Sequence, residues 1–140
     1  MNVDDIIFVE ADSKVKSIDF EINGEAIAQN GWKLAFRGRV KPYLFDPLKK
    51  EKTELRKMID DAITSYGVKT PIFTKADVAV KICFGLARVS SKDLDNMAKF
   101  LLDTLEGAIY DDDKFIIDLH LKKATVVDPK MTISITSIIN

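Results

Sequence analysis

The amino-acid sequence predicts an α+β domain in which two main helices pack on one mixed β-sheet. Three observations lead to this class. Segments in which apolar and polar residues alternate outnumber segments with helical spacing. The two kinds of segment do not follow one another in regular strand-helix order, which argues against a doubly wound fold. A length of 140 residues suits one domain, so residues 1–140 are predicted to form a single domain.

The first half of the chain predicts two strands, a basic connection and a helix. Residues 17–22 alternate in polarity and end at the turn Asn23-Gly24, and residues 6–9 form a second short apolar run. Residues 29–43 are basic, contain glycines and aromatic residues, and predict a loop or a loose hairpin. A helix then begins with Asp46 as its N-cap and Pro47 in its first turn, and it ends at Gly67.

The second half predicts three strands around one amphipathic helix. Alternation is unbroken over residues 77–88, which is therefore the clearest strand. Apolar residues recur at helical spacing over residues 94–105, and Gly107 ends that helix. Two further strands are predicted around residues 115–123 and 132–138.

The composition limits the kinds of site that the chain can build. It contains one cysteine, Cys83, and one histidine, His120, which excludes an internal disulfide framework, a cysteine-based zinc site and a multi-histidine metal centre. Carboxylates remain as metal ligands, and they favour hard cations such as Mg²⁺ or Mn²⁺. The apolar run near the start is too short for a signal or membrane segment, so a cytoplasmic protein is expected.

Charge is unevenly distributed along the chain. The net charge is only −1, yet residues 33–57 contain nine basic and three acidic residues, a net charge of +6, which leaves −7 on the remainder. This asymmetry indicates a polyanion contact beside a separate acidic site. The alternative is a solvated basic helix face.

Carboxylates gather around the second predicted helix. Asp93 and Asp95 lie where the clearest strand passes into the helix, and Lys99 follows Asp95 by one turn. After the helix, residues 111–113 are three consecutive aspartates that lead into the next strand. If that strand returns antiparallel, the aspartates converge on Asp93 and Asp95. Converging carboxylates repel one another, and a divalent cation that serves phosphate-ester chemistry would relieve the repulsion.

Each of these residues also has a simpler interpretation. Asp93 could only cap the helix, Asp95 and Lys99 could form a surface ion pair, and residues 111–113 could be a solvated turn. Cys83 is expected to be a small packed side chain. His120 shares a strand face with Asp118 and Lys122.

The sequence from residue 92 to 122 resembles the RusA family of Holliday junction resolvases. That family carries an Asp-x-Asp-Asn element that opens a helix, a lysine one turn later, and an Asp-Asp pair before a closing aspartate. The matching residues are Asp93-Leu94-Asp95-Asn96, Lys99, Asp103, Leu105, Asp112-Asp113 and Ile116-Ile117-Asp118. A weaker match covers residues 20–24 and 37–46. The sequence departs from the family in its less basic loop, Gln29-Asn30-Gly31-Trp32-Lys33.

The resemblance implies roles for individual residues. Asp93, Asp95 and Asp113 match catalytic, metal-binding aspartates, Asp112 is a further candidate ligand, and Lys99 matches a lysine at the scissile phosphate. The expected contacts to DNA phosphates are Lys33, Arg37, Arg39, Lys41, Arg88 and Lys92.

The implied function is a structure-selective endodeoxyribonuclease that nicks four-way DNA junctions with Mg²⁺, for which Mn²⁺ would substitute. A homodimer with two active sites is expected, because resolution needs two nicks related by a two-fold axis. Three aromatic residues near the basic loop could stack on unpaired bases or pack in the core or a dimer: Trp32, Phe36 and Tyr43. The candidates for the dimer interface are Trp32, Leu34, Phe36, Leu44 and Phe45. Two alternatives remain, a nuclease of the same fold that acts on flaps, forks or linear duplex, and a DNA-binding protein without catalysis.

Overall fold

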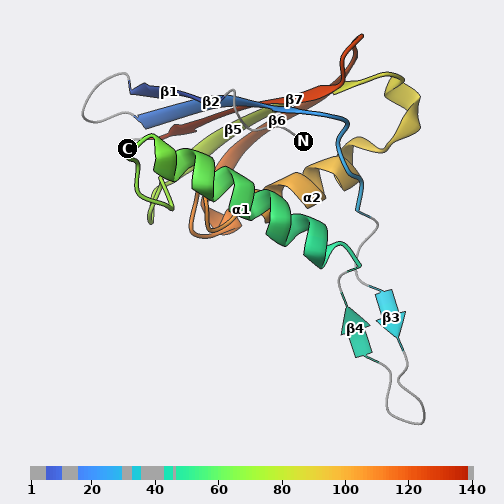
Figure 1. The fold of residues 1–140 in the computed structure, drawn as a ribbon, viewed down its shortest axis with the longest axis horizontal. Coiled ribbons are helices and arrows are strands. Elements are labelled where there is room, and N and C mark those ends of the chain that lie inside the picture. Colours follow the sequence, from blue (N-terminus) through green and yellow to red (C-terminus); the bar gives the residue numbers. More distant parts are fainter. Residues whose placement is uncertain (1–5, 11–15, 30–32, 36–42, 46, 139–140) are drawn as a thin grey trace.

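The structure is a computed structural model that describes residues 6–10, 16–29, 33–35, 43–45 and 47–138. Its main feature is a five-stranded sheet in the order β1-β2-β7-β5-β6. These strands are β1 (Ile6–Glu10), β2 (Lys16–Asn23), β5 (Val78–Leu86), β6 (Ile116–Thr125) and β7 (Lys130–Ser137). Two short strands, β3 (Lys33–Ala35) and β4 (Tyr43–Phe45), pair with each other apart from this sheet (Figure 1).

Two helices cover one face of the sheet. They are α1 (Lys49–Ser65) and α2 (Leu94–Leu105), and Figure 1 shows both on the same side. The strand residues that alternate toward them are apolar and buried, as the periodicity predicts: Ile18, Phe20, Ile22, Val78, Val80, Ile82, Phe84, Met131, Ile133 and Ile135. Burying this set against the helices is the main source of stability. Among the described residues, no helix is long and apolar enough to cross a membrane.

The mixed sheet and its two helices confirm the predicted α+β class. The predicted turn glycines are also correct, because Gly24, Gly67 and Gly107 all have positive φ. The predicted start of the first helix is wrong: α1 begins at Lys49 with Leu48 at the N-cap position, whereas Asp46 lies outside the described residues. Met58 and Tyr66, which share its apolar stripe in the sequence, are exposed.

The relation between β5 and β6 decides where the carboxylates lie. β6 pairs parallel to β5, from Val78 opposite Ile116 to Leu86 opposite Thr125. The expected antiparallel return is therefore wrong. Because α2 crosses from the end of β5 to the start of β6, residues that follow β5 and residues that precede β6 lie at opposite ends of the two strands. Nine residues of strand span roughly 26 Å.

Two small 3₁₀ turns, unforeseen in the sequence, complete the crossover. η1 (Val89–Ser91) precedes α2, and η2 (Asp113–Phe115) follows it.

Candidate active site

The N-terminal end of α2 presents the two aspartates of the sequence motif. Asp93 is the N-cap residue, with extended backbone angles, but its side chain makes no capping hydrogen bond. Asp95 lies in the first turn, and both carboxylates are exposed. The simple capping interpretation of Asp93 therefore fails, and both carboxylates remain available to a ligand.

Lys99 lies one turn further along the same helix and is exposed. No ion pair is recorded between its side chain and Asp95, so the surface-pair interpretation also lacks support among the described contacts. The positive end of the helix dipole lies at this point, and it favours negatively charged groups near the start of α2.

Lys92, which directly precedes the N-cap residue of α2, forms contacts with two other segments of the chain. Its ammonium donates a hydrogen bond to the Ala26 carbonyl and lies 3.8 Å from a carboxylate oxygen of Glu25. Its own carbonyl accepts a hydrogen bond of 3.1 Å from the Lys123 ammonium. These contacts join the segment after β2 to the start of α2, and the expected contact of Lys92 with DNA stays a prediction. Arg88, the other basic residue expected near Asp93, has an exposed side chain.

The C-terminal end of α2 carries a second group of carboxylates. Oxygens of Glu106, Asp112 and Asp113 all lie within 4.8 Å of one another, and we call these three residues the acidic cluster. Gly107, with φ of 93°, turns the chain directly after Glu106. The turn brings the later aspartates back to the helix end, where the Asp113 amide donates to Glu106 Oε1 at 3.2 Å.

The three consecutive aspartates point in different directions. Asp111 accepts hydrogen bonds from the backbone amide of Lys75, at 3.4 and 3.2 Å, and so caps a neighbouring loop. Asp112 accepts from the Lys114 amide at 2.9 Å and begins η2. Of these three aspartates, Asp112 and Asp113 belong to the acidic cluster and Asp111 does not.

The acidic cluster is electrostatically unfavourable without a cation. Partial desolvation raises the pKa of the Asp113 carboxyl above its ordinary value, and the charge of Asp112, a hydrogen bond to Asp112, and the charge of Asp103 raise it further. The negative end of the helix dipole adds to the repulsion. Divalent cations relieve such repulsion most directly, since each carboxylate can supply one oxygen ligand.

Two cationic residues of α1 hold the last turn of α2. Arg56 donates from Nε to the Thr104 carbonyl at 3.1 Å and from Nη2 to the Asp103 carbonyl at 2.6 Å. Lys52, which is only 7% exposed, pairs with Asp103 at 3.1 Å. These contacts satisfy carbonyls that the helix leaves unpaired and bring positive charge next to the acidic cluster.

The two carboxylate groups are not brought together within one chain. α2 separates Asp93 and Asp95 from Asp112 and Asp113 by roughly 18 Å of helix. The predicted convergence of these four aspartates is therefore wrong for a single chain, because β6 runs parallel to β5.

Sequence reasoning also missed Glu106. Glu106 is not among the residues that match the RusA family. The one signal for it in the sequence is its position directly before Gly107, the residue that ends the predicted helix.

Other residues singled out in the sequence either lie outside the described residues or have surroundings that differ from those expected. Arg37, Arg39, Lys41, Trp32 and Phe36 lie outside the described residues, and Lys33 begins β3. Cys83 does not pack in the core, because it lies on the sheet face opposite the helices, between buried Ile82 and Phe84. His120 shares that face with Lys122 and pairs with Asp118 at 3.1 Å.

A family model described as endodeoxyribonuclease RusA matches residues 33–136, which is more than half of the chain. The match includes both ends of α2 and the basic segment that begins at Lys33. No curated protein matches the chain.

Proposed function

The chain belongs to the endodeoxyribonuclease RusA family, and we propose that it resolves four-way DNA junctions by paired, metal-dependent phosphodiester hydrolysis. One observation carries the proposal beyond the family. The two ends of α2 each present a group of acidic side chains, with Lys99 beside one end and Arg56 and Lys52 against the other. Carboxylates and a lysine of this kind are the groups that divalent-metal phosphate chemistry requires.

The acidic cluster fits a small divalent cation. Octahedral Mg²⁺ keeps opposite oxygen ligands about 4.2 Å apart. The carboxylate oxygens of Glu106, Asp112 and Asp113 lie within 4.8 Å of one another, so small side-chain movements suffice to hold the ion. Mg²⁺ is the cofactor that we propose, with Mn²⁺ as a substitute. A bound cation would neutralise the scissile phosphate and activate a water molecule.

The protein's own residues divide the remaining work. Asp93 and Asp95 complete the ligand set together with Asp113 and Asp112. Lys99 donates to the phosphate and stabilises the negative charge that grows on it during the reaction. The exposed position of Asp93, Asp95 and Lys99 allows a large, rigid duplex to reach them.

A homodimer reconciles these roles with the separation of the carboxylates. β6 is an edge strand of the sheet, and it exposes Ile117 by 55% and Leu119 by 41%. We propose that two β6 edges pair antiparallel about a two-fold axis. The start of one β6 then lies beside the end of the other, so Asp113 of one copy approaches Asp93 and Asp95 of its partner.

This arrangement suits the substrate as well as the metal. A two-fold dimer has two equivalent sites at fixed separation, and a four-way junction presents two equivalent strands that must both be cut. The proposed dimer also buries Ile117 and Leu119 and pairs the backbone N–H and C=O groups at the free edge of β6. Native proteins usually protect such sheet edges from pairing with other chains.

The direct test is to incubate the purified chain with a synthetic four-way junction and Mg²⁺. We expect symmetric nicks in opposite strands, lost when EDTA is added. A parallel panel of flaps, forks and linear duplex tests the alternative substrates, and faster cutting of any of these would replace the junction as the substrate. Binding of the junction without cleavage under any divalent metal would instead favour the DNA-binding protein without catalysis.

A further inference from the structure

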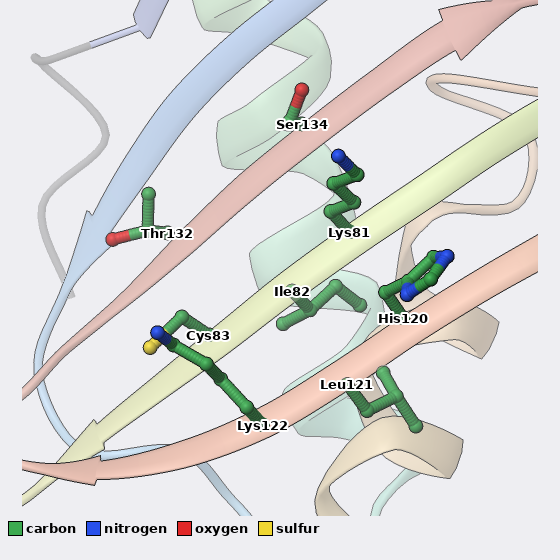
Figure 2. A pocket seen from close by; sticks show the side chains of 8 residues that line it. All are labelled: Lys81, Ile82, Cys83, His120, Leu121, Lys122, Thr132 and Ser134. Carbon is green, nitrogen blue, oxygen red and sulfur yellow. The ribbon is translucent and has the colours of Figure 1, made fainter.

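The sheet has one open face in addition to the face that the helices cover. Side chains that alternate away from α1 and α2 on the last three strands of the order are polar: Lys81 and Cys83 on β5, His120 and Lys122 on β6, and Thr132 and Ser134 on β7. The register brings them together, because Lys81 lies opposite both His120 and Ser134, and Cys83 lies opposite both Lys122 and Thr132. Figure 2 looks onto this face with a helix behind the sheet.

These six side chains line a shallow hollow of about 430 Å³, whose remaining lining residues are Ile82 and Leu121. We call it the open-face hollow. Most of its surface is apolar side-chain carbon, and it has no large aromatic surface on which a base could stack. Its polar atoms belong to ammonium groups, hydroxyls and an imidazole. Groups of this kind bind phosphate oxygens and sugars rather than bases.

The charges on this face differ from one strand to the next. His120 is paired with Asp118, and Lys130 is paired with Glu21 at 3.1 Å. For Lys81 and Lys122, no ion pair is recorded within the described part of the chain. Asp118 on β6 is an acidic residue of this face as well, and it is set against Lys81 and Lys122. Asp19 and Glu21 lie further away on β2, with β7 between them and β5. The side of the open face formed by β5 and β6 is therefore the basic side.

We propose that the open-face hollow binds the phosphate backbone of a DNA arm, through Lys81 and Lys122 with hydroxyl contacts from Thr132 and Ser134. The inference rests on the proposed function, since it adds a second DNA contact to a DNA-cleaving protein. Charge complementarity supports this occupant, because DNA carries a phosphate charge about every 1.7 Å along the duplex axis. Lys81 and Lys122, which form no ion pair with any described residue, are exposed on adjacent strands. β6 belongs to this hollow and also to the proposed dimer edge, so a DNA arm held here remains next to the cleavage site.

The experiment compares a double variant with a charge-matched control. Lys81→Gln with Lys122→Gln removes two positive charges from exposed strand positions and keeps similar side-chain lengths. The control is Lys69→Gln with Lys75→Gln, two exposed lysines outside both the hollow and the basic segment of residues 33–57. Binding of a fluorescent four-way junction is measured by anisotropy in EDTA over a range of salt concentrations. Each phosphate contact contributes about 0.9 to the slope of log affinity against log salt, so the slope of the hollow variant should fall by about 1.8.

Cys83 supplies a second measurement that needs no lysine substitution. It is the sole cysteine of the chain, it lies within the hollow, and its side chain is partly exposed. Junction DNA should slow the reaction of Cys83 with a thiol reagent several-fold, whereas inorganic phosphate at the same phosphate concentration should protect it far less. Equal protection by inorganic phosphate would contradict a DNA-backbone site.

The outcomes separate this inference from the proposed function. If the wild-type chain cleaves junctions while the hollow variant keeps the full salt slope and Cys83 reacts at the same rate with and without DNA, the hollow is not a DNA contact and the cleavage function stands. In the opposite case, the salt slope falls in the hollow variant and DNA protects Cys83, but the wild-type chain cleaves no junction with any divalent metal. The hollow is then supported as a DNA contact and the catalytic proposal fails.

Discussion

The two ends of α2 differ in how their acidic residues are held. At the N-terminal end, Asp93 and Asp95 come from one contiguous segment, with Leu94 between them. At the C-terminal end, Glu106, Asp112 and Asp113 come from both sides of a glycine turn and are fixed by backbone hydrogen bonds. A motif can be read directly from a sequence when its residues are contiguous, whereas a cluster assembled across a turn needs the fold.

The helix dipole acts oppositely at the two ends. It stabilises carboxylates at the start of α2 and opposes them at its end. The protein offsets the second effect with Arg56 and Lys52 from α1, which contact the last turn of α2. The C-terminal end is therefore the one that gains most from a bound cation, and the following predictions test this contrast.

The largest expected effect comes from removing a carboxylate at either end. Asp95→Asn and Asp113→Asn should each lower junction cleavage by at least about 100-fold, since even indirect partners of metal ligands contribute 10- to 100-fold. Junction binding should stay intact or become tighter, because negative charge near a polyanion is lost. Cleavage rates and binding are measured on the same junction in Mg²⁺ and in EDTA.

A mixture of these two variants tests whether each active site is built from one chain or from two. If each site combines the N-terminal end of one copy with the C-terminal end of the other, an Asp95→Asn/Asp113→Asn mixed dimer keeps one complete site and nicks one strand. If each site lies within one chain, the mixture stays inactive. Inactivity of a mixture shown by mass spectrometry to contain mixed dimers would refute the shared site.

Lys99 is expected to affect the rate of junction cleavage but not the binding of the metal ion. Lys99→Ala removes a donor to the phosphate and should lower the maximal rate by about 100-fold, in the range of a lost transition-state hydrogen bond. The rise in melting temperature on adding Mn²⁺ should equal that of the wild type. Lys99→Arg should recover little activity, because the guanidinium is larger and differently directed.

Arg56 tests how the C-terminal end is held. Arg56→Ala leaves two carbonyls of the last turn of α2 without their charged donor, and we expect the free energy of unfolding to fall by about 2–4 kcal/mol. The matched control is Lys57→Ala, whose side chain is exposed and forms only a long surface pair with Asp61. The control should change stability by no more than about 0.5 kcal/mol in urea unfolding. Equal effects of the two substitutions would show that Arg56 does not stabilise this end.

The smallest effect concerns pH. Because the pKa of Asp113 is raised in the folded chain, the native state binds more protons than the unfolded state above the ordinary value of 3.8, and stability falls as pH rises through that window. Without divalent metal, Asp113→Asn should therefore increase stability at pH 7 by a few tenths of a kcal/mol, as expected for removing a like-charge contact. Near pH 3 the gain should vanish. A gain that persists at low pH would exclude charge repulsion as the cause.

Much of the fold followed from local patterns. The alternation over residues 77–88 corresponds to β5, and the apolar stripe before Gly107 corresponds to α2, because burial on one face imposes a period on each element. The start of α1 was mispredicted because Asp46 and Pro47 are good helix-start residues wherever they occur, and the helix begins only after them.

The sequence by itself determined the two helices, the strands of the main sheet and the family resemblance, since each of these depends on patterns within contiguous residues. The choice of Asp93, Asp95, Asp112 and Asp113 as site residues follows from that resemblance and stays a prediction. The tertiary structure alone decided that β6 is parallel to β5, that Glu106 joins Asp112 and Asp113, and that Lys81 and Lys122 share an open sheet face. The physical reason is that strand direction depends on how apolar faces from distant segments pack together, whereas the alternation of a single strand is the same in either direction. Because β6 runs parallel and not antiparallel to β5, Asp112 and Asp113 lie at the C-terminal end of α2, away from Asp93 and Asp95 at its N-terminal end.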